Sequence, residues 1–211
     1  MCSVRSRRFN DSLKNPDSRP RADYQLVGIP LIQVDAFADR PFTGNPAAVC
    51  LLDAPADADW MQAVAAEMNL SETAFVRPLE SGFELRWFTP AVEVELCGHA
   101  TLAAAHALWS QGVVTEDAPI EFSTLSGTLV CSRHEQTIEL DFPATPVDAI
   151  ADDADLAAAL GVDAVFTGAS KFDRLVRVAS EAEVRRIEPD LQALRRIPVR
   201  GVIVTATSDD P

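Results

Sequence analysis

The sequence predicts an α+β fold in which strands surround one buried helix. Short strand-like runs, apolar throughout or alternating with polar residues, recur between turn signals along most of the chain. Residues 99–111, in contrast, form a helical run that is nearly apolar on every side. Such a helix must be enclosed by protein, and its many alanines keep it thin enough for strands to pack closely around it.

The spacing of apolar residues and the turn residues between them predict the elements that precede this helix. Two strands are expected at 31–37 and 47–52, separated by a turn at Pro41–Pro46 that contains a Gly-Asn-Pro sequence. A helix capped by Asp57 or Asp59 comes next, because apolar residues recur after it at helical spacing. Further strands are expected at 73–76 and 83–88 and, after the buried helix, at 120–122, 128–132 and 137–142.

The chain is expected to divide into two lobes at a proline-containing linker, residues 143–146. The first lobe would span 28–143 and the second 144–211. In the second we expect a helix at 155–160, strands at 164–167 and 174–178, a helix at 182–195 and a strand at 199–206. This segment is about half as long as the first and has no counterpart of the buried helix, so it is predicted to be a partial lobe that cannot close a similar core alone.

Residues 1–27 are expected to lie outside the fold as a disordered extension. Residues 1–25 carry six Lys/Arg and three Asp, contain two prolines and have no apolar stretch long enough for a secretory signal. A start codon placed too far upstream would give the same pattern.

The charge balance excludes several partners. The 211 residues hold 18 Lys+Arg against 32 Asp+Glu, a formal net charge of −14, whereas nucleic-acid binding needs clustered cations. No apolar run reaches the roughly 18 residues that span a bilayer. We therefore expect a small-molecule substrate and neither a nucleic-acid nor a membrane partner, with a homodimer as an open alternative for the assembly.

The cysteines and histidines predict no metal site. Cys2, Cys50, Cys97 and Cys131 are far apart, and the three histidines do not supply the close ligand pairs usual in zinc sites. A chain with a full-sized core does not need disulfides, so the expected location is the cytoplasm.

Cys97-Gly98-His99-Ala100-Thr101 is the first place that could carry chemistry. The N–H groups at a helix start attract an anion, and glycine lets a ligand approach the backbone. A histidine there suits hydrogen bonding in its neutral form, and a thiol there is biased toward thiolate. The alternative is that Gly98 turns the chain while Cys97 and His99 fill space.

Two further places lie in connecting segments. Asn69-Leu70-Ser71-Glu72-Thr73 joins a helix to a strand, and a carboxylate at the edge of an apolar core suits a general acid or base. The alternative is a solvated connector in which Ser71 or Thr73 satisfies backbone groups. Gly44-Asn45-Pro46 could bind a carboxylate through backbone amides, or could be a simple tight turn.

Four runs appear in an order and at a spacing that resemble the PhzF-like family of phenazine biosynthesis. They are Val34-Asp35-Ala36-Phe37 with Pro41-Phe42-Thr43-Gly44-Asn45-Pro46-Ala47-Ala48-Val49, then Asn69-Leu70-Ser71-Glu72-Thr73-Ala74-Phe75, Arg86-Trp87-Phe88-Thr89-Pro90 and Cys97-Gly98-His99-Ala100-Thr101. The resemblance covers about residues 30–206. It implies the diaminopimelate-epimerase-like fold: two pseudo-equivalent lobes, each a curved sheet wrapped around a central helix, with the site between them.

The resemblance also implies roles for individual residues. Glu72 matches the family's catalytic acid/base and His99 its active-site histidine, whereas Gly44, Asn45 and Gly98 match loop positions that line the cleft. We add Ser71, beside Glu72, as a substrate-binding candidate. Cys97 stands where related epimerases place a catalytic cysteine and ranks lower as a catalytic candidate.

The resemblance ends near residue 206. The family pattern continues into an Asp-Pro-Val-Thr-Gly-Ser-Ala-His-like segment that supplies the second lobe's central helix, and nothing in this chain matches it. The second lobe is therefore expected to be truncated.

The sequence thus predicts a PhzF-like isomerase that needs no cofactor or metal and performs acid/base proton transfer on a small carboxylate-bearing metabolite, in a phenazine-type or related biosynthetic process. Two alternatives stay open: an epimerase or racemase that depends on Cys97, and a catalytically inactive truncated fragment.

Overall fold

The computed structural model describes residues 28–40, 42–115, 117–135 and 137–208 of the chain. The expected disorder of residues 1–27 therefore concerns residues outside the described part. The chain forms two compact units, Met1–Pro143 and Ala144–Pro211, and each is described by itself.

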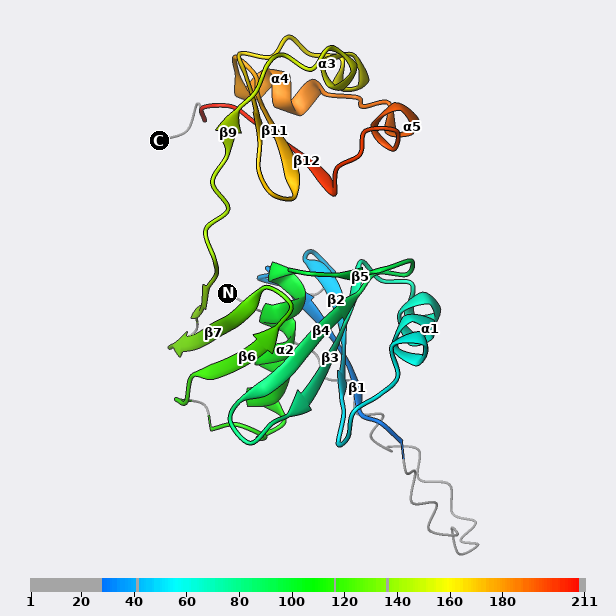
Figure 1. Cartoon of the computed structure of the whole chain (residues 1–211). Coiled ribbons are helices and arrows are strands. Elements are labelled where there is room, and N and C mark those ends of the chain that lie inside the picture. The colour runs from blue at the N-terminus through cyan, green and yellow to red at the C-terminus, as the bar shows by residue number, and fades with distance from the viewer. Residues whose placement is uncertain (1–27, 41, 116, 136, 209–211) are drawn as a thin grey trace, which may run out of the picture. The chain divides into compact units, whose positions relative to one another are not determined.

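Unit 1 is built on a strongly curved mixed sheet (Figure 1). Within the described residues its hydrogen-bonded order is β1-β2-β3-β4-β6-β7-β8, with β5 paired to β4. The β2–β3 and β4–β6 pairs are parallel and the others antiparallel. The strands are β1 Leu31–Ala36, β2 Asn45–Leu51, β3 Glu72–Pro78, β4 Phe83–Phe88, β5 Glu93–Val94, β6 Ile120–Thr124, β7 Gly127–His134 and β8 Thr137–Asp141.

The concave face of this sheet encloses α2, Gly98–Ser110. Most of its residues are buried, and its alanines belong to the same apolar cluster as Val34, Val49, Trp87 and Phe122 from four different strands. A side chain as small as alanine allows strands to approach the helix closely, so burial of the helix on every side is compatible with dense packing. The predicted central helix and the predicted α+β class are both confirmed.

The opposite face of the sheet is covered by α1, Ala58–Met68. Asp57 caps this helix, because its Oδ1 accepts hydrogen bonds from the N–H groups of Asp59 at 2.9 Å and Trp60 at 3.3 Å. The helix ends at Asn69, whose φ of 49° is left-handed. Since side chains alternate between faces along a strand, β2 and β3 each contribute to both clusters.

Unit 2 contains a smaller sheet, with the order β12-β11-β10-β9 among its described residues. Helices cover one face, and Leu156, Leu160, Val176 and Val178 form the centre of its core. The elements are β9 Asp148–Ala149, α3 Ala154–Leu160, β10 Phe166–Ala169, β11 Asp173–Arg177, α4 Glu181–Arg186, α5 Leu191–Leu194 and β12 Gly201–Thr205.

The prediction of a single helix at 182–195 is wrong. The structure has two short helices there, α4 and α5, and Asp190 caps the second through hydrogen bonds from Gln192 and Ala193. Pro189 explains the break, because a proline lacks the N–H that a helix interior needs and disfavours the helical conformation of the residue before it. Within the described residues, no helix has the length and apolar character to cross a membrane.

Candidate active site

Glu72 is positioned by the alternation of β3. Ala74 and Val76 point to the concave face and pack in the α2 cluster, so Glu72 at the start of the same strand points to that face as well. Parallel pairing sets Glu72 opposite Ala47 of β2. The carboxylate therefore lies at the end of the strand, on the face that holds α2, with 18% of its side chain exposed.

His99 lies in the first turn of α2, which begins differently from the other described helices. The N-caps of α1, α3, α4 and α5 each accept a hydrogen bond through the side chain, whereas Cys97, the N-cap of α2, makes no such cap bond. The Thr101 hydroxyl instead donates to the Cys97 carbonyl at 2.6 Å. The N–H groups of this first turn are thus not occupied by the N-cap side chain, and they carry the positive end of the helix dipole.

The structure brings Glu72, Cys97 and His99 together. Glu72 Oε2 lies 3.2 Å from His99 Nε2, and Cys97 Sγ lies 3.4 Å from His99 Nδ1. The imidazole therefore stands between a carboxylate and a thiol. If Nε2 carries the proton, Nδ1 can accept one from the thiol, so a neutral ring is compatible with both contacts.

The contact between Glu72 Oε2 and His99 Nε2 is close, but it leaves the hydrogen-bonding capacity of both atoms unused. Glu72 Oε2 and His99 Nε2 are both buried, and neither makes a well-aligned hydrogen bond within the described part of the chain. Buried polar atoms rarely lack a hydrogen bond partner in folded proteins. Each of the two atoms can therefore still form a hydrogen bond with a further partner, such as a polar atom of a substrate.

Burial lowers the pKa of His99 below the usual value of a histidine, while the nearby Glu72 carboxylate acts in the opposite direction. Because burial is the larger cause, the imidazole is favoured in its neutral form near pH 7. A neutral imidazole can donate at one nitrogen and accept at the other, as its two neighbours require.

The remaining substrate-binding candidates fall into two groups. Asn45 begins β2, and its Oδ1 accepts a hydrogen bond from the Ser71 hydroxyl at 3.3 Å, so these two residues meet beside Glu72. Gly98 lies between Cys97 and His99 as the first residue of α2. Gly44 packs tightly against a neighbouring segment of the chain, because a Cβ added there would come within 2.2 Å of the Ala36 carbonyl oxygen.

Thr101 was not singled out from the sequence. Its hydroxyl fixes the Cys97 carbonyl, which orients the turn that carries Gly98 and His99. The signal that could have found it is a threonine near the start of the expected helix, because its hydroxyl can reach back to the carbonyl four residues earlier.

Glu72, Cys97 and His99 also form a group that could hold a metal by ligand type. One ligand atom from each lies within 4.8 Å of the others, and zinc accepts carboxylate, thiolate and imidazole ligands. Both imidazole nitrogens already contact a neighbour, so an ion would have to separate His99 from Glu72 or from Cys97. The expected absence of a metal stays a prediction.

Comparison with known proteins places the chain in a family. The family model described as a phenazine biosynthesis-like protein, PhzC-PhzF, matches residues 34–210. An uncharacterized isomerase of Halalkalibacterium halodurans is 47% identical over 184 residues, which is 87% of this chain and 69% of that protein. An uncharacterized isomerase of Pseudomonas aeruginosa is 49% identical over 177 residues, 82% of this chain and 66% of the relative.

A crystal structure of a PhzF-family phenazine biosynthesis protein from Enterococcus faecalis superposes with a TM-score of 0.76 at 40% identity, covering 86% of this chain and 70% of that one. The chain thus spans about two thirds of the length of the relatives that it matches. A match that extends over most of the chain, in sequence and in fold, shows that this protein belongs to the PhzC-PhzF family of phenazine biosynthesis-like proteins.

Proposed function

We propose that the protein is an isomerase that moves a proton between two carbons of a small carboxylate-bearing metabolite, with Glu72 as the acid/base. The observation that carries the proposal is the position of the Glu72 carboxylate, 3.2 Å from His99 Nε2, with both atoms buried and poorly satisfied. The isomerase names of the two bacterial relatives support the same class of reaction.

In this mechanism Glu72 removes a proton from an activated C–H bond and returns one at another carbon. The bond between that carbon and hydrogen breaks, its electron pair moves into the substrate's conjugated system, and a new C–H bond forms from the carboxyl proton. No electrons leave the substrate, so the step balances without a redox partner. Such a reaction depends on positioning and on preorganised hydrogen bonds.

A substrate carboxylate would bind at the start of α2. The N–H groups there are not occupied by the Cys97 side chain, and the helix dipole favours an anion at this end. His99 would donate or accept a hydrogen bond with a polar group of the substrate. Asn45 and Ser71, which meet beside Glu72, would contact the part of the substrate nearest the strand ends.

The test is solvent-proton exchange. The chain is incubated in deuterated water with a panel of small carboxylates that bear an activated C–H bond, and label incorporation is followed by proton NMR. Glu72→Gln keeps the shape of the side chain and is expected to lower exchange by about 10²-fold or more. Glu121→Gln, at an exposed position on β6, is the matched control and is expected to exchange as the wild type does.

Equal label incorporation by Glu72→Gln and by the wild type would show that the acid/base assignment is wrong. Absence of exchange by the wild type over the whole panel would favour the alternative of an inactive fragment.

A second candidate function is an epimerase or racemase that uses Cys97. It is favoured by the 3.4 Å contact between Cys97 Sγ and His99 Nδ1, since an adjacent imidazole can accept the thiol proton. Cys97→Ala distinguishes the two candidates. Loss of exchange in this variant, with exchange retained in Glu72→Gln, would reverse the ranking of the two residues.

A further inference from the structure

Unit 2 contains a hollow of about 550 Å³ whose lining is unusually basic. Lys171, Arg174, Arg195 and Arg200 line it, together with Phe172 and Ile197, and no acidic residue is among the described residues that line it. We call it the basic hollow. Four of the eight Lys/Arg residues between positions 144 and 211 are gathered here, in a chain whose net charge is −14.

Arg174 enters the basic hollow from the core face of the sheet. Val176 and Val178 on the same strand or just after it belong to the core of unit 2, and alternation sets Arg174 on their side. Its Nε is buried and has no hydrogen bond partner within the described part of the chain. Burying an unsatisfied charged donor costs free energy unless a ligand satisfies it.

Arg195 approaches the basic hollow from the end of α5. It is the C-cap of that helix and is exposed. The ion pairs found among the described residues include neither Arg195 nor Arg174. Both guanidinium groups are therefore available to an anion, and each presents a planar fork that matches the oxygens of a carboxylate or phosphate.

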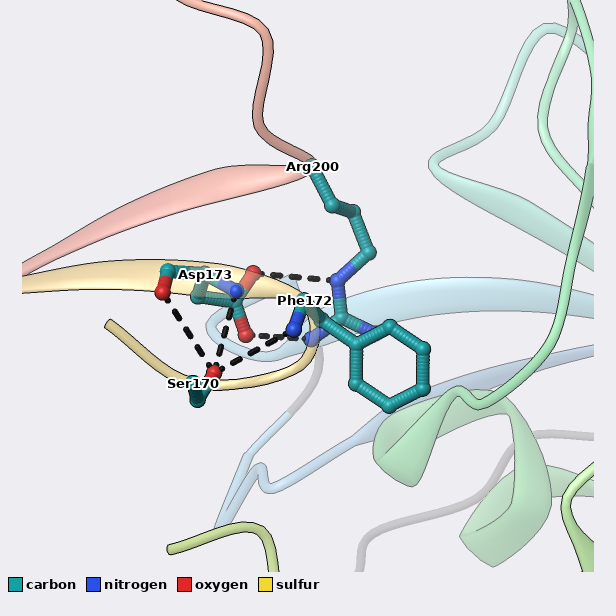
Figure 2. A network of polar contacts seen from close by, with 4 residues as sticks. All are labelled: Ser170, Phe172, Asp173 and Arg200. Carbon is teal, nitrogen blue, oxygen red and sulfur yellow. Dashed lines mark hydrogen bonds and ion pairs between the residues drawn. The ribbon is translucent and has the colours of Figure 1, made fainter. Parts of the chain in front are cut away.

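The rim of the basic hollow is held in a fixed geometry (Figure 2). Arg200 donates from Nε to Asp173 Oδ1 at 3.0 Å and from a terminal nitrogen to Oδ2 at 2.6 Å. Its guanidinium carbon lies 4.6 Å from the centre of the Phe172 ring, and Lys171 Nζ lies 4.5 Å from the same centre. Two cations are thus ordered around one aromatic ring before any ligand arrives.

Ser170 orders the turn that carries Phe172. Its hydroxyl oxygen accepts hydrogen bonds from the N–H groups of Phe172 at 3.3 Å and Asp173 at 3.0 Å, and Figure 2 shows these contacts beside the Asp173–Arg200 pair. The Arg200 N–H also donates to the Phe172 carbonyl at 3.0 Å, which ties the start of β12 to the turn.

We propose that the basic hollow binds a small polyvalent oxyanion, bearing phosphate or carboxylate groups, between Arg174 and Arg195, with Lys171 and Arg200 at its rim. Its volume lies within the range of about 300–1,000 Å³ usual for small-molecule sites. The assignment concerns residues of unit 2 only and stands independently of the chemistry proposed for Glu72.

Isothermal titration calorimetry tests the proposal, with pyrophosphate and citrate as separate probes at one ionic strength set by potassium chloride. The wild-type chain is expected to bind one equivalent of at least one probe. Arg195→Gln and Arg174→Gln are each expected to weaken binding at least tenfold. Arg177→Gln, an exposed arginine of β11 outside the basic hollow, is the matched control and is expected to bind as the wild type does. Binding of pyrophosphate alone would identify a phosphate ligand, and binding of citrate alone a carboxylate ligand.

The proposal is overturned if neither probe binds, if Arg177→Gln weakens binding as much as Arg174→Gln and Arg195→Gln do, or if those two variants bind like the wild type. Because Arg174 borders the core, the melting temperature of its variant without ligand is measured as well. It is expected to equal or exceed that of the wild type, since the substitution removes an unsatisfied charged group. A clear fall would assign Arg174 a structural role, and binding by the exposed Arg195 variant would then decide the outcome.

Discussion

Glu72 Oε2 lies 3.2 Å from His99 Nε2, and this contact joins the first residue of β3 to the first turn of α2. The sheet curves around α2, so the end of a strand and the start of the helix that it encloses meet at one edge of the core. An apolar core on one side and solvent on the other give the pair the mixed surroundings in which acid/base groups are usually placed.

His99 is predicted to matter through the hydrogen bonds it can make. His99→Leu removes both ring nitrogens and is expected to lower proton exchange by roughly 10²-fold, whereas His99→Gln retains a polar group near the position of Nε2 and should lose less. The measurement is deuterium incorporation, with circular dichroism as a check on folding. Wild-type activity in both variants would mean that His99 fills space and does not contact the substrate.

A chelator is predicted to leave proton exchange unchanged. Both imidazole nitrogens of His99 have a close neighbour, and Glu72 can act as a base only if no ion holds its carboxylate. Exchange rates are measured before and after dialysis against EDTA, with metal content determined in both samples. A loss of activity that added zinc restores would instead make Glu72, Cys97 and His99 a metal centre.

Unit 1 is predicted to lose stability as the solution is acidified below about pH 6.5. Burial lowers the pKa of His106, with the Arg133 charge acting in the same direction, and burial likewise lowers that of His99. Below the unfolded-state pKa of about 6.5 the unfolded chain binds protons that the folded chain does not, so the free energy of unfolding falls with falling pH until the folded-state pKa is reached. Each group contributes a slope of at most about 1.4 kcal/mol per pH unit.

The measurement is urea unfolding at several pH values between 7.5 and 5, followed by tryptophan fluorescence, which reports on unit 1 because all three tryptophans lie there. His106→Asn is expected to make the pH dependence shallower. His134→Asn, at an exposed histidine, is the matched control. A pH dependence unchanged by the His106 substitution would contradict the assignment.

Cys50 and Cys131 are predicted to resist alkylation while the chain is folded. Burial raises the pKa of Cys50 to about 11 and that of Cys131 to about 12, so at pH 8 no more than about one thiol in a thousand is ionised. Iodoacetamide labelling followed by peptide mass spectrometry is expected to modify both only after urea is added. Rapid labelling of either cysteine without denaturant would show that its strand opens readily.

Much of unit 1 could be predicted from local pattern. Strands and helices differ in the period of their apolar residues. The alanine-rich run 99–111 is nearly apolar on every side, which predicts a helix enclosed by the sheet. The recurrence of apolar residues at 182–195 does not show the break between α4 and α5, which depends on the single residue Pro189.

The candidate site was less accessible to the same reasoning. Glu72 and His99 lie on different elements, and local pattern does not state that the end of β3 meets the start of α2. Resemblance to a family supplied that pairing. The basic hollow was missed because its four cations are scattered over thirty residues, although Arg174 carried a signal: it interrupts the apolar alternation that Val176 and Val178 continue.

Gly44 and Gly98, the two glycines proposed for the site from the sequence, are predicted to differ in what they do. A Cβ at Gly44 would come within 2.2 Å of the Ala36 carbonyl oxygen and 2.8 Å of Ala38 Cβ, so Gly44→Ala must displace backbone and is expected to destabilise unit 1 by about 1–3 kcal/mol. A Cβ at Gly98 would meet only Phe142 Cε2, at 3.7 Å, an ordinary van der Waals distance.

Gly98→Ala should therefore fold with a stability close to that of the wild type, within about 1 kcal/mol. If a substrate carboxylate approaches the backbone at the start of α2, the added methyl group obstructs it, and proton exchange falls although the fold is intact. Urea unfolding and deuterium incorporation, measured on both variants, separate the two effects. Full exchange activity in Gly98→Ala would mean that the substrate does not approach this part of the backbone, and that the carboxylate binds elsewhere.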